Sequence, residues 1–364
     1  MTTQALDKAK VDAFAGQMIG YLNGGNVALM TSIGYHTGLI DALADMQPST
    51  SAQIAERAGL NERYVREWLG TMVTGRVVDY NPTHRTYWLP PEHAAVITRA
   101  AGPQNLAVFA AFLPQLAQVE DGIIRAFQQG GGVPYADFPQ FQRMMAQLSG
   151  QIFDATLLDV TLKLVPGLTE RLAAGLDVAD IACGSGHAIN IMAKAFPASR
   201  FTGYDFSAEG IAAGRAEAER LGLPNARFVE QDIALLDLDN AYDFVTVFDA
   251  IHDQAQPRAV LRNIARALRP DGAFLAVDVH ASSQLHENLD HPLAPSFYAI
   301  STMHCMTVSL ALGGEGLGNM WGEQKARELL TEAGLVILDV KQVEGDILND
   351  YYICTKERPA IGIT

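Results

Sequence analysis

The stretch FDAIHDQ at residues 248–254 ends an apolar run with two titratable side chains, His252 and Asp253. An apolar run of this length is typical of a buried strand, so the pair is expected where the strand leaves the core. One interpretation is a polar turn with a hydrogen-bonded histidine. The other is a general base at the mouth of an active site, because histidine exchanges a proton near neutral pH. The stretch alone leaves both interpretations open.

A glycine-rich turn follows another predicted strand. The run LDVADIA at 176–182 leads into CGSG, so Gly184 and Gly186 fall between a strand and a helix, where glycine lets the backbone approach a ligand closely. Asp205 ends the next predicted strand, about 20 residues further on, where a carboxylate can bind ribose hydroxyls. Asp232 ends the third strand, where it can accept a hydrogen bond from an adenine amino group.

Three kinds of cofactor compete for this turn. A phosphate-binding P-loop would end in Gly-Lys-Ser/Thr, which is absent, and a dinucleotide site would favour glycine at Ile189. S-adenosylmethionine carries a sulfonium and a free ammonium group, which suit the acid Asp180 ahead of the turn. The pattern favours this third cofactor. The residues predicted to line its site are Asp180, Cys183, Gly184, Gly186, Asp205, Phe206, Asp232, Ile233 and Asp249.

Strand and helix patterns alternate from residue 176 to the end of the chain. This alternation predicts an α/β fold with a parallel, doubly wound sheet. The strand candidates are 176–182, 199–205, 226–232, 243–250, 272–279 and 351–356. The helix candidates between them are 187–196, 208–222 and 257–269.

The N-terminal part has a different pattern. Residues 4–45 predict two helices that are broken at Gly24-Gly25-Asn26, and the second is apolar enough to need burial, which a second subunit would provide. Residues 48–90 predict a winged helix-turn-helix, with caps at Thr50 or Ser51 and at Asn61. Five arginines, no lysine and four acids fall in that range, so the balance is nearly neutral and favours a dimerising role over DNA binding.

Length and composition limit the protein class. A chain of 364 residues predicts about two domains of ~100–200 residues each. The formal net charge of −15 argues against nucleic acid or an anionic membrane as the main partner. Three widely spaced cysteines predict neither a disulfide framework nor a zinc motif. The start lacks the apolar core of a signal peptide and no apolar run is long enough for a membrane helix, so we expect a cytoplasmic protein.

The order of these motifs resembles a known family. DIACGSGH, YDFS, EQDI, FDAIHD and LRPDGAFLAVD follow one another as in class I S-adenosylmethionine-dependent methyltransferases, although Ala182 stands where the family usually has glycine. With the winged helix ahead of it, the chain resembles small-molecule O-methyltransferases of plants and bacteria. It is most similar to a mycobacterial and actinobacterial group of such enzymes. The resemblance implies a Rossmann-like methyltransferase sheet and an all-α, winged-helix domain that forms a homodimer.

The resemblance also implies roles for individual residues. His252 corresponds to the general base that takes a proton from a substrate hydroxyl, and Asp253 would orient it or cap the helix that begins near Pro257. The stretch FQRMMAQLS at 141–149 resembles a helix of the family that faces substrate and cofactor, which would place Met145 in the substrate site and Ser149 in the cofactor site.

A segment after the fifth strand, residues 278–321, lies where this family places substrate-binding insertions. The predicted substrate-binding residues in it are His280, Tyr298, His304 and Trp321. Its Met-rich and aromatic content suits the wall of an apolar pocket, and suits a plain core equally well. A metal site from Asp278, His280, His291 and His304 is an alternative, but their spacing matches no known metal motif, so no metal is predicted.

The sequence therefore predicts a cytoplasmic, homodimeric methyltransferase that uses S-adenosylmethionine, leaves S-adenosylhomocysteine and acts on a small aromatic or hydrophobic molecule. The predicted division is a dimerisation domain at 1–99, a helical linker or lid at 100–170 and the methyltransferase domain at 171–364. O-methylation with His252 as base is the leading mechanism. The alternatives are N- or C-methylation with His252 only lining the pocket, and a DNA-binding regulator that senses S-adenosylmethionine.

Overall fold

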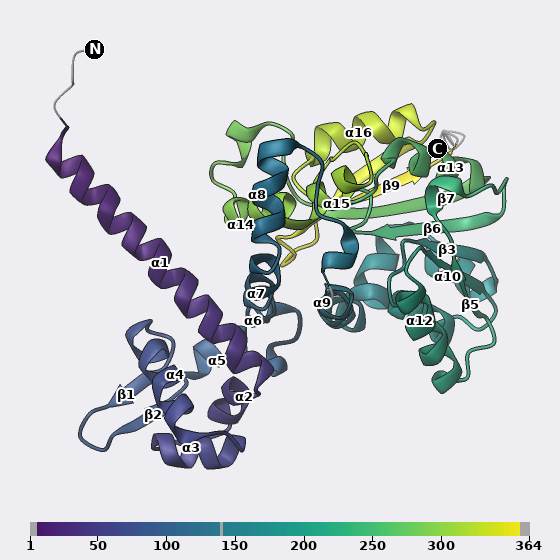
Figure 1. Ribbon diagram of the computed structural model, residues 1–364. Coiled ribbons are helices and arrows are strands. Elements are labelled where there is room, and N and C mark those ends of the chain that lie inside the picture. The colour runs from purple at the N-terminus through teal and green to yellow at the C-terminus, as the bar shows by residue number, and fades with distance from the viewer. Residues whose placement is uncertain (1–5, 139–140, 357–364) are drawn as a thin grey trace, which may run out of the picture. The chain divides into compact units, whose positions relative to one another are not determined.

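One long helix, α1 (Lys8–His36), opens the N-terminal unit of the chain (Figure 1). The computed structural model describes residues 6–138 and 141–356 and divides the chain into two units, residues 1–117 and 118–364. The predicted helix break at Gly24-Gly25-Asn26 is wrong, because α1 runs through it. Glycine in a helix costs only about 1 kcal/mol and does not forbid the helical conformation. The chain turns later, at Gly38, whose φ of 71° suits glycine.

The winged helix-turn-helix is confirmed. Its elements are α2 (Leu39–Ala44), α3 (Ser51–Ala58), α4 (Glu62–Thr74), β1 (Asp79–Asn81) and β2 (Thr86–Trp88). Thr50 caps α3 in a capping box with Gln53, and Asn61 caps α4 through the N–H of Arg63. The two strands pair antiparallel as the wing. The unit continues with α5 (Pro91–Ile97), η1 (Arg99–Gln104), α6 (Ala107–Ala110) and α7 (Phe112–Ala117).

The C-terminal unit is built on a seven-stranded sheet in the order β5-β4-β3-β6-β7-β9-β8. Its strands are β3 (Asp177–Ile181), β4 (Arg200–Asp205), β5 (Ala226–Glu230), β6 (Tyr242–Phe248), β7 (Leu268–Val279), β8 (Val336–Lys341) and β9 (Asn349–Thr355). The strands from β3 to β7 pair in parallel, which confirms the predicted doubly wound, Rossmann-like sheet. β9 instead pairs antiparallel with β7 and with β8, to which the loop 342–348 joins it.

Helices cover both faces of the sheet (Figure 1). One apolar cluster packs α13 (Pro257–Ala267) and α16 (Gly322–Glu332) against the sheet. A second packs α10 (Leu168–Ala174), α11 (His187–Ala195) and α12 (Ala208–Leu221) against the opposite face. Because both faces are covered, central strands such as β6 are buried along most of their length, which explains their continuous apolar runs.

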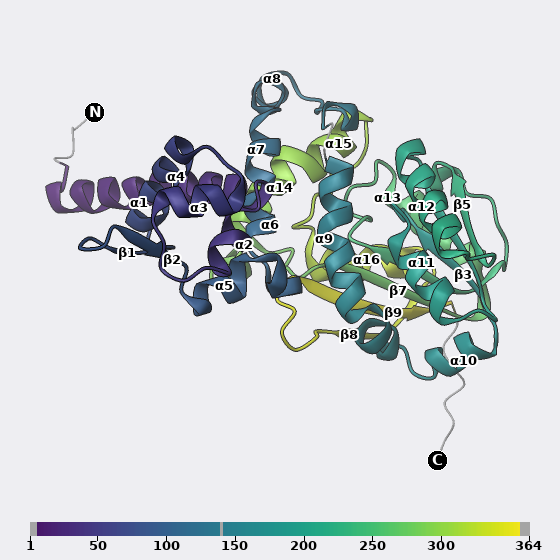
Figure 2. The same cartoon turned by 90° about the horizontal axis from the view of Figure 1, so that it is seen from below.

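The remaining helices of the C-terminal unit connect these elements. They are α8 (Glu120–Gln129), η2 (Tyr135–Asp137), α9 (Phe141–Thr156), η3 (Leu157–Thr161), η4 (Leu162–Leu164), η5 (Ile233–Leu235), η6 (Leu285–Asn288), α14 (Ala294–Ile300), η7 (Ser301–Cys305) and α15 (Met306–Ala311). Figure 2 shows α9 beside α11. His187, the first residue of α11, pairs with Asp154 of α9 and with Glu217 of α12.

The predicted domain limits at residues 99 and 170 stay predictions, since the contacts within the chain divide it at residue 117. Within residues 6–138 and 141–356, no single helix has the length and apolar composition needed to cross a membrane. The pair Ala107–Ala117 and Glu120–Gln129 meets those two criteria only when taken together across a bend.

Candidate functional site

The turn after β3 is built from residues in the left-handed region. Ala182, Gly184 and Gly186 have φ values of 56°, 55° and 70°. Glycine adopts this conformation freely, whereas an alanine there costs roughly 1–2 kcal/mol. Ala182, where the family usually has glycine, therefore has a strained backbone conformation that glycine would adopt without strain. The rest of the turn must stabilise this conformation.

Asp205 fixes this turn from the neighbouring strand. Its Oδ2 accepts a hydrogen bond from the Gly184 N–H at 2.8 Å, and its Oδ1 accepts one from the Ser207 N–H at 2.8 Å. The side chain is buried, and burial raises its pKa even though the backbone N–H groups favour the charged form. The structure therefore brings together two residues, Gly184 and Asp205, that lie 21 positions apart in sequence.

Asp180 lies below the turn, inside the sheet. Its Oδ1 accepts a hydrogen bond from the hydroxyl of Thr246 on β6 at 2.7 Å. Burial, together with the nearby charge of Asp205, raises the pKa of Asp180 to about 7. A cation bound close to these two acids would favour their charged forms, because it supplies the charge that burial removes from water.

Three further predicted cofactor residues differ in their surroundings. Phe206 is 53% exposed, and its ring packs edge-on against Tyr135. The exposed Asp232 caps η5 by accepting a hydrogen bond from the Ala234 N–H at 2.9 Å. Ile233 is buried in the apolar cluster under α13, so the structure assigns its side chain to the core.

Cys183 and Asp249 complete the predicted cofactor set. The Cys183 N–H donates to the carbonyl oxygen of Tyr204 at 2.9 Å, and burial raises the pKa of its thiol. Asp249 follows β6 with a φ of 48°, and its buried Oδ1 has no hydrogen-bond partner within the described part of the chain. Burial and the charge of Asp278 raise its pKa to about 7. An unpaired buried oxygen of this kind suits a ligand that donates a hydrogen bond.

His252 is buried in the turn after β6 and lies between two carboxylates. Its Nδ1 is 2.6 Å from Oδ1 of Asp278, and its Nε2 is 3.2 Å from Oδ1 of Asp253. Burial lowers the pKa of His252, but the two carboxylates outweigh it and hold the pKa well above its ordinary value. In the neutral ring, the contact with Asp278 assigns the proton to Nδ1. Nε2, on the side of Asp253, then carries the lone pair.

Asp278 was not predicted as a site residue. It lies at the end of β7, and the parallel pairing of β6 with β7 brings it beside the turn that carries His252. The signal in the sequence was an acid that ends the apolar run GAFLAV, comparable to Asp205. The predicted cap at Asp253 is not formed, because Gln256 is the N-cap of α13 and makes no side-chain cap.

A π-helix, η7, places His304 and Cys305 next to this pair. His304 is fully buried, and its ring packs edge-on against Tyr135 at 5.7 Å and Phe138 at 4.7 Å between centroids. Burial lowers the pKa of His304 to about 4, so the ring is neutral at physiological pH. Single turns of π-helix are frequent at functional sites, where they turn side chains toward a ligand. His304 lies near His252 and Asp253, whose charges act on its pKa.

The segment that carries Tyr135 contacts both a predicted cofactor residue, Phe206, and a predicted substrate residue, His304. Tyr135 also packs edge-on against Phe206, with centroids 5.6 Å apart. Gly132 anchors the segment, because a Cβ there would lie 1.9 Å from the carbonyl oxygen of Thr307, and the Val133 N–H donates to the Thr307 hydroxyl at 2.8 Å. Gly132 and Val133 therefore pack on α15, and Tyr135 and Phe138 pack on η7, while Pro139 and Gln140, within the predicted linker or lid at 100–170, lie outside the described residues.

A glycine-rich segment, residues 313–318, lies in the predicted insertion 278–321 and supports the His252 turn, a role that was not predicted. The Gly318 N–H donates to the carbonyl oxygen of His252 at 3.2 Å. Ser309 is fully buried, and its hydroxyl donates to the Gln254 carbonyl at 2.9 Å and accepts from the Gly316 N–H at 3.0 Å. These bonds fix the backbone on both sides of His252.

The other predicted substrate residues make contacts of their own. His280 pairs through Nδ1 with Asp350 at 2.9 Å, and the Tyr298 hydroxyl accepts a hydrogen bond from Asn288 at 3.1 Å. Trp321 is 8% exposed and packs in the core cluster around α16, which favours a core role for it.

On α9, the Ser149 hydroxyl donates to the Met145 carbonyl oxygen at 2.6 Å. The two predicted residues therefore lie one turn apart on the helix that packs beside α11, which begins at the glycine turn.

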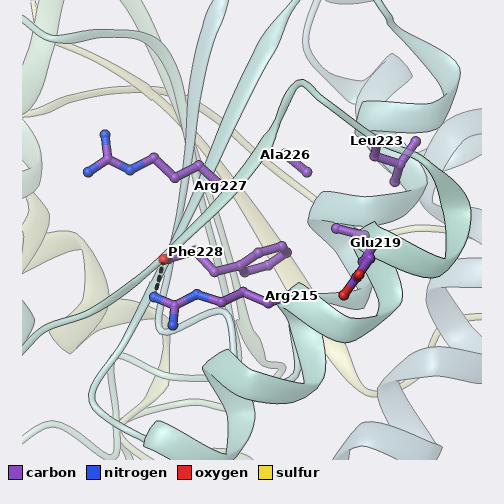
Figure 3. Close-up of a pocket in the computed structure, with 7 residues that line it drawn as sticks. Arg215, Glu219, Leu223, Ala226, Arg227 and Phe228 are labelled. Carbon is purple, nitrogen blue, oxygen red and sulfur yellow. Dashed lines mark hydrogen bonds between the residues drawn. The ribbon is translucent and has the colours of Figure 1, made fainter.

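A pocket lies between α12 and β5 (Figure 3), and the ring of Phe228 in its lining packs against Gly186. It is lined by Arg215, Arg227 and Phe228 among others, and Arg215 donates to the Phe228 carbonyl oxygen at 2.8 Å. The lining part of β5 is its amino end, whereas Gly184, Asp205 and His252 follow the carboxyl ends of parallel strands. Ligands of doubly wound sheets bind at the carboxyl ends, so this pocket is not the candidate site.

Comparison with known families decides the class of the C-terminal unit. Residues 172–334 match the family of methyltransferase domains, and residues 25–99 match the Rv2258c-like winged HTH domain. The chain carries a methyltransferase domain. The predicted order of a winged helix followed by a methyltransferase domain is confirmed.

Curated relatives match mainly over the methyltransferase domain. A demethylmenaquinone methyltransferase of Listeria welshimeri is 28% identical over 142 residues, which are 38% of this chain and 58% of the relative. An arsenite methyltransferase of Aquipseudomonas alcaligenes is 32% identical over 127 residues, which are 32% of this chain and 37% of the relative. The chain thus spans little more than half the length of the first of these relatives and less of the second.

Solved structures resemble the whole chain. The structure of human N-acetylserotonin methyltransferase in complex with S-adenosylmethionine has a TM-score of 0.69 and 15% identity, and covers 98% of this chain and 100% of its own. The structure of mitomycin 7-O-methyltransferase has a TM-score of 0.64 and 18% identity, and covers 96% of this chain and 100% of its own. At these identities the likeness establishes the fold: a winged-helix unit followed by a methyltransferase domain.

Proposed function

We propose that the protein transfers the methyl group of S-adenosylmethionine to an oxygen atom of a small aromatic or hydrophobic molecule. The observation that carries this proposal is the buried His252, held by Asp278 at the same edge of the sheet as the glycine turn and Asp205. The parallel strands β3, β4, β6 and β7 end at this edge, which supports the proposal that the predicted cofactor residues and His252 act together there.

The residues of this edge fit S-adenosylmethionine. The backbone at Gly184 and Gly186 can approach a ligand closely, and Asp205 can accept hydrogen bonds from ribose hydroxyls. Burial raises the pKa values of Asp180 and Asp249, and a cationic ligand beside them would stabilise their charged forms. Oδ1 of Asp249 can accept a hydrogen bond from such a ligand. When bound, S-adenosylmethionine supplies an electrophilic methyl group on a positively charged sulfur.

The chain's own chemical step is the removal of one proton. Nε2 of neutral His252 accepts the proton of the acceptor hydroxyl as the oxygen attacks the methyl carbon. Asp278 holds the Nδ1–H and stabilises the imidazolium that forms, and Asp253 beside Nε2 adds to this. The rest of catalysis is positioning of two bound reactants, which requires a rigid turn at His252.

Aromatic side chains support the class of acceptor. Tyr135 and Phe138 surround His304, which adjoins the His252 pair through η7. Flat apolar rings favour a flat apolar ligand. Two structural relatives carry names that specify small molecules, N-acetylserotonin and mitomycin, which agrees with such an acceptor.

The test of this function is methyl transfer from S-adenosylmethionine labelled in its methyl group to a panel of small phenols. We expect the label to appear in a methyl ether of at least one phenol, with an equal amount of S-adenosylhomocysteine. A matched panel in which each phenol is already methylated serves as control. Label found in both panels, or only on nitrogen or carbon of other acceptors, would contradict O-methylation.

We propose further that the protein is a cytoplasmic homodimer joined through its N-terminal unit. The first half of α1 is exposed and carries Phe14, Tyr21 and Leu22, each more than 60% exposed within this chain. Large exposed apolar patches mark interaction surfaces, and an all-round apolar helix needs burial.

Sedimentation tests the dimer. We expect the mass of two chains for the protein as it is, and of one chain for the double variant Phe14→Asp, Leu22→Asp, because buried unpaired charges disfavour association. Leu289→Asp, at a 76% exposed position of the other unit, is the matched control and should stay dimeric. A single-chain mass before any substitution would refute the dimer.

A further inference from the structure

Three side chains of different chemistry converge beside the proposed base. The ligand atoms of His252, Asp253 and Cys305 all lie within 4.8 Å of one another. Two come from the turn after β6 and the third from the π-helix η7. Among the described residues this is the one such group with metal-binding potential, and it differs from the set weighed from the sequence, in which Asp278, His280, His291 and His304 were considered.

We propose that His252, Asp253 and Cys305 form a binding site for a thiophilic divalent cation such as Zn²⁺, and that the bound ion inhibits methyl transfer by occupying Nε2 of His252. The inhibition rests on the proposed function, since it requires His252 to act as base. The binding site itself does not.

The set of donor atoms fits this class of ion. Zn²⁺ is bound in proteins by imidazole nitrogen, thiolate sulfur and carboxylate oxygen, whereas Mg²⁺ and Ca²⁺ prefer oxygen alone. Three protein ligands leave the fourth coordination position of the ion for a water molecule, as in zinc sites with three protein ligands. The 3.2 Å between Nε2 of His252 and Oδ1 of Asp253 is a short separation, suited to two ligands of one ion.

The surroundings orient the ligands. Metal-binding histidines usually donate their other ring N–H to a carboxylate, and here Nδ1 of His252 lies 2.6 Å from Oδ1 of Asp278. Because Nδ1 is engaged by Asp278, Nε2, which faces Asp253, is the ring nitrogen that can bind an ion. Oδ1 of Asp253 is buried and lies 3.2 Å from Nε2 of His252, so an ion bound there would contact both atoms. Cys305 is 5% exposed, so its sulfur is shielded from bulk solvent.

Binding of Co²⁺ to the full-length protein tests the site, because Co²⁺ replaces Zn²⁺ and gives visible absorption bands that include a sulfur-to-metal transition. We expect such bands on titration and their loss when Zn²⁺ is added. Cys305→Ser should abolish the sulfur band, and Asp253→Asn should weaken binding, while both variants leave the helical circular dichroism unchanged. Cys354→Ser, at a buried thiol of β9, is the matched control and should keep the band.

The positioning carboxylate gives a second measure. Asp278→Asn should lower the affinity for Co²⁺ by about 10- to 100-fold, because it removes the partner that orients His252. Absence of a sulfur band in the unsubstituted protein, or its persistence in Cys305→Ser, would overturn the site.

Inhibition is measured separately, with Zn²⁺ and Mg²⁺ added to the methyl-transfer assay. We expect Zn²⁺ to inhibit and Mg²⁺ to have no effect, and Cys305→Ser to lower the sensitivity to Zn²⁺. If the cobalt bands appear but Zn²⁺ leaves methyl transfer unchanged, the metal site stands and the role of His252 as base is refuted. If the bands are absent while His252→Ala is inactive, the base stands and the metal site is refuted.

Discussion

Replacing His252 with alanine is expected to lower kcat for a hydroxyl acceptor by about 10²- to 10⁴-fold while leaving the affinity for S-adenosylmethionine unchanged. The expectation follows from the position of the side chain, which adjoins Asp278 and Asp253 rather than the glycine turn. Single-turnover methyl transfer gives the rate, and calorimetric titration gives the cofactor affinity.

The control variant is His286→Ala, because the side chain of His286 is 75% exposed and lies outside this group. It should transfer methyl groups at the unsubstituted rate. If His252→Ala also keeps that rate, the histidine only lines the pocket. That result would contradict a general base at His252 and would favour N- or C-methylation.

The pH dependence separates a base from a structural histidine. Asp278 and Asp253 hold the pKa of His252 well above its ordinary value, so the protonated form, which cannot act as a base, prevails below that pKa. The rate should therefore rise with pH as the imidazole loses its proton. Asp278→Asn removes one of the two raising charges, so this rise should move to lower pH while the maximal rate falls. A purely structural Asp278 would lower the rate without moving the profile.

Local signals explain why much of the fold was predictable. The caps at Thr50 and Asn61 and the alternation of strands with helices depend on neighbouring residues, which a sequence displays directly. The break expected at Gly24-Gly25 failed because helix propensity is a weak preference that its surroundings overrule. Strand β8, an edge strand that is only partly buried, was missed although four of its six residues are aliphatic.

The candidate site was predictable where strand ends define it. Asp205 and Gly184 were placed together because neighbouring parallel strands end at one edge, and their hydrogen bond bears this out. The same logic would have found Asp278, at the end of the strand beside β6. His304 was predicted as a substrate-binding residue, but Cys305 was not. Its place beside His252 depends on a π-helix, whose extra residue per turn shifts which side chains face the site, and no local pattern in the sequence marks such a turn.

Replacing Asp205 with alanine should lower the affinity for S-adenosylmethionine and for S-adenosylhomocysteine by at least about 100-fold. The carboxylate holds the Gly184 and Ser207 N–H groups, and a hydrogen bond to a charged group contributes about 1.5–3 kcal/mol. Its loss leaves both donors unpaired, frees the turn and removes the predicted acceptor for the ribose hydroxyls. Calorimetric titration with each ligand measures the loss, and circular dichroism checks that the fold survives.

Two further variants separate the role of Asp205 from a general effect of charge. Glu209→Ala removes an equal charge from an exposed position in the first turn of α12, and it should bind both ligands as the unsubstituted protein does. Asp205→Asn keeps one acceptor oxygen but loses the charge, so its affinity should lie between those of the alanine variant and the unsubstituted protein. If Asp205→Ala binds both ligands normally, the cofactor does not lie at this edge of the sheet. His252 would then have no methyl donor beside it, so a retained affinity would refute the proposed mechanism as well as the proposed cofactor site.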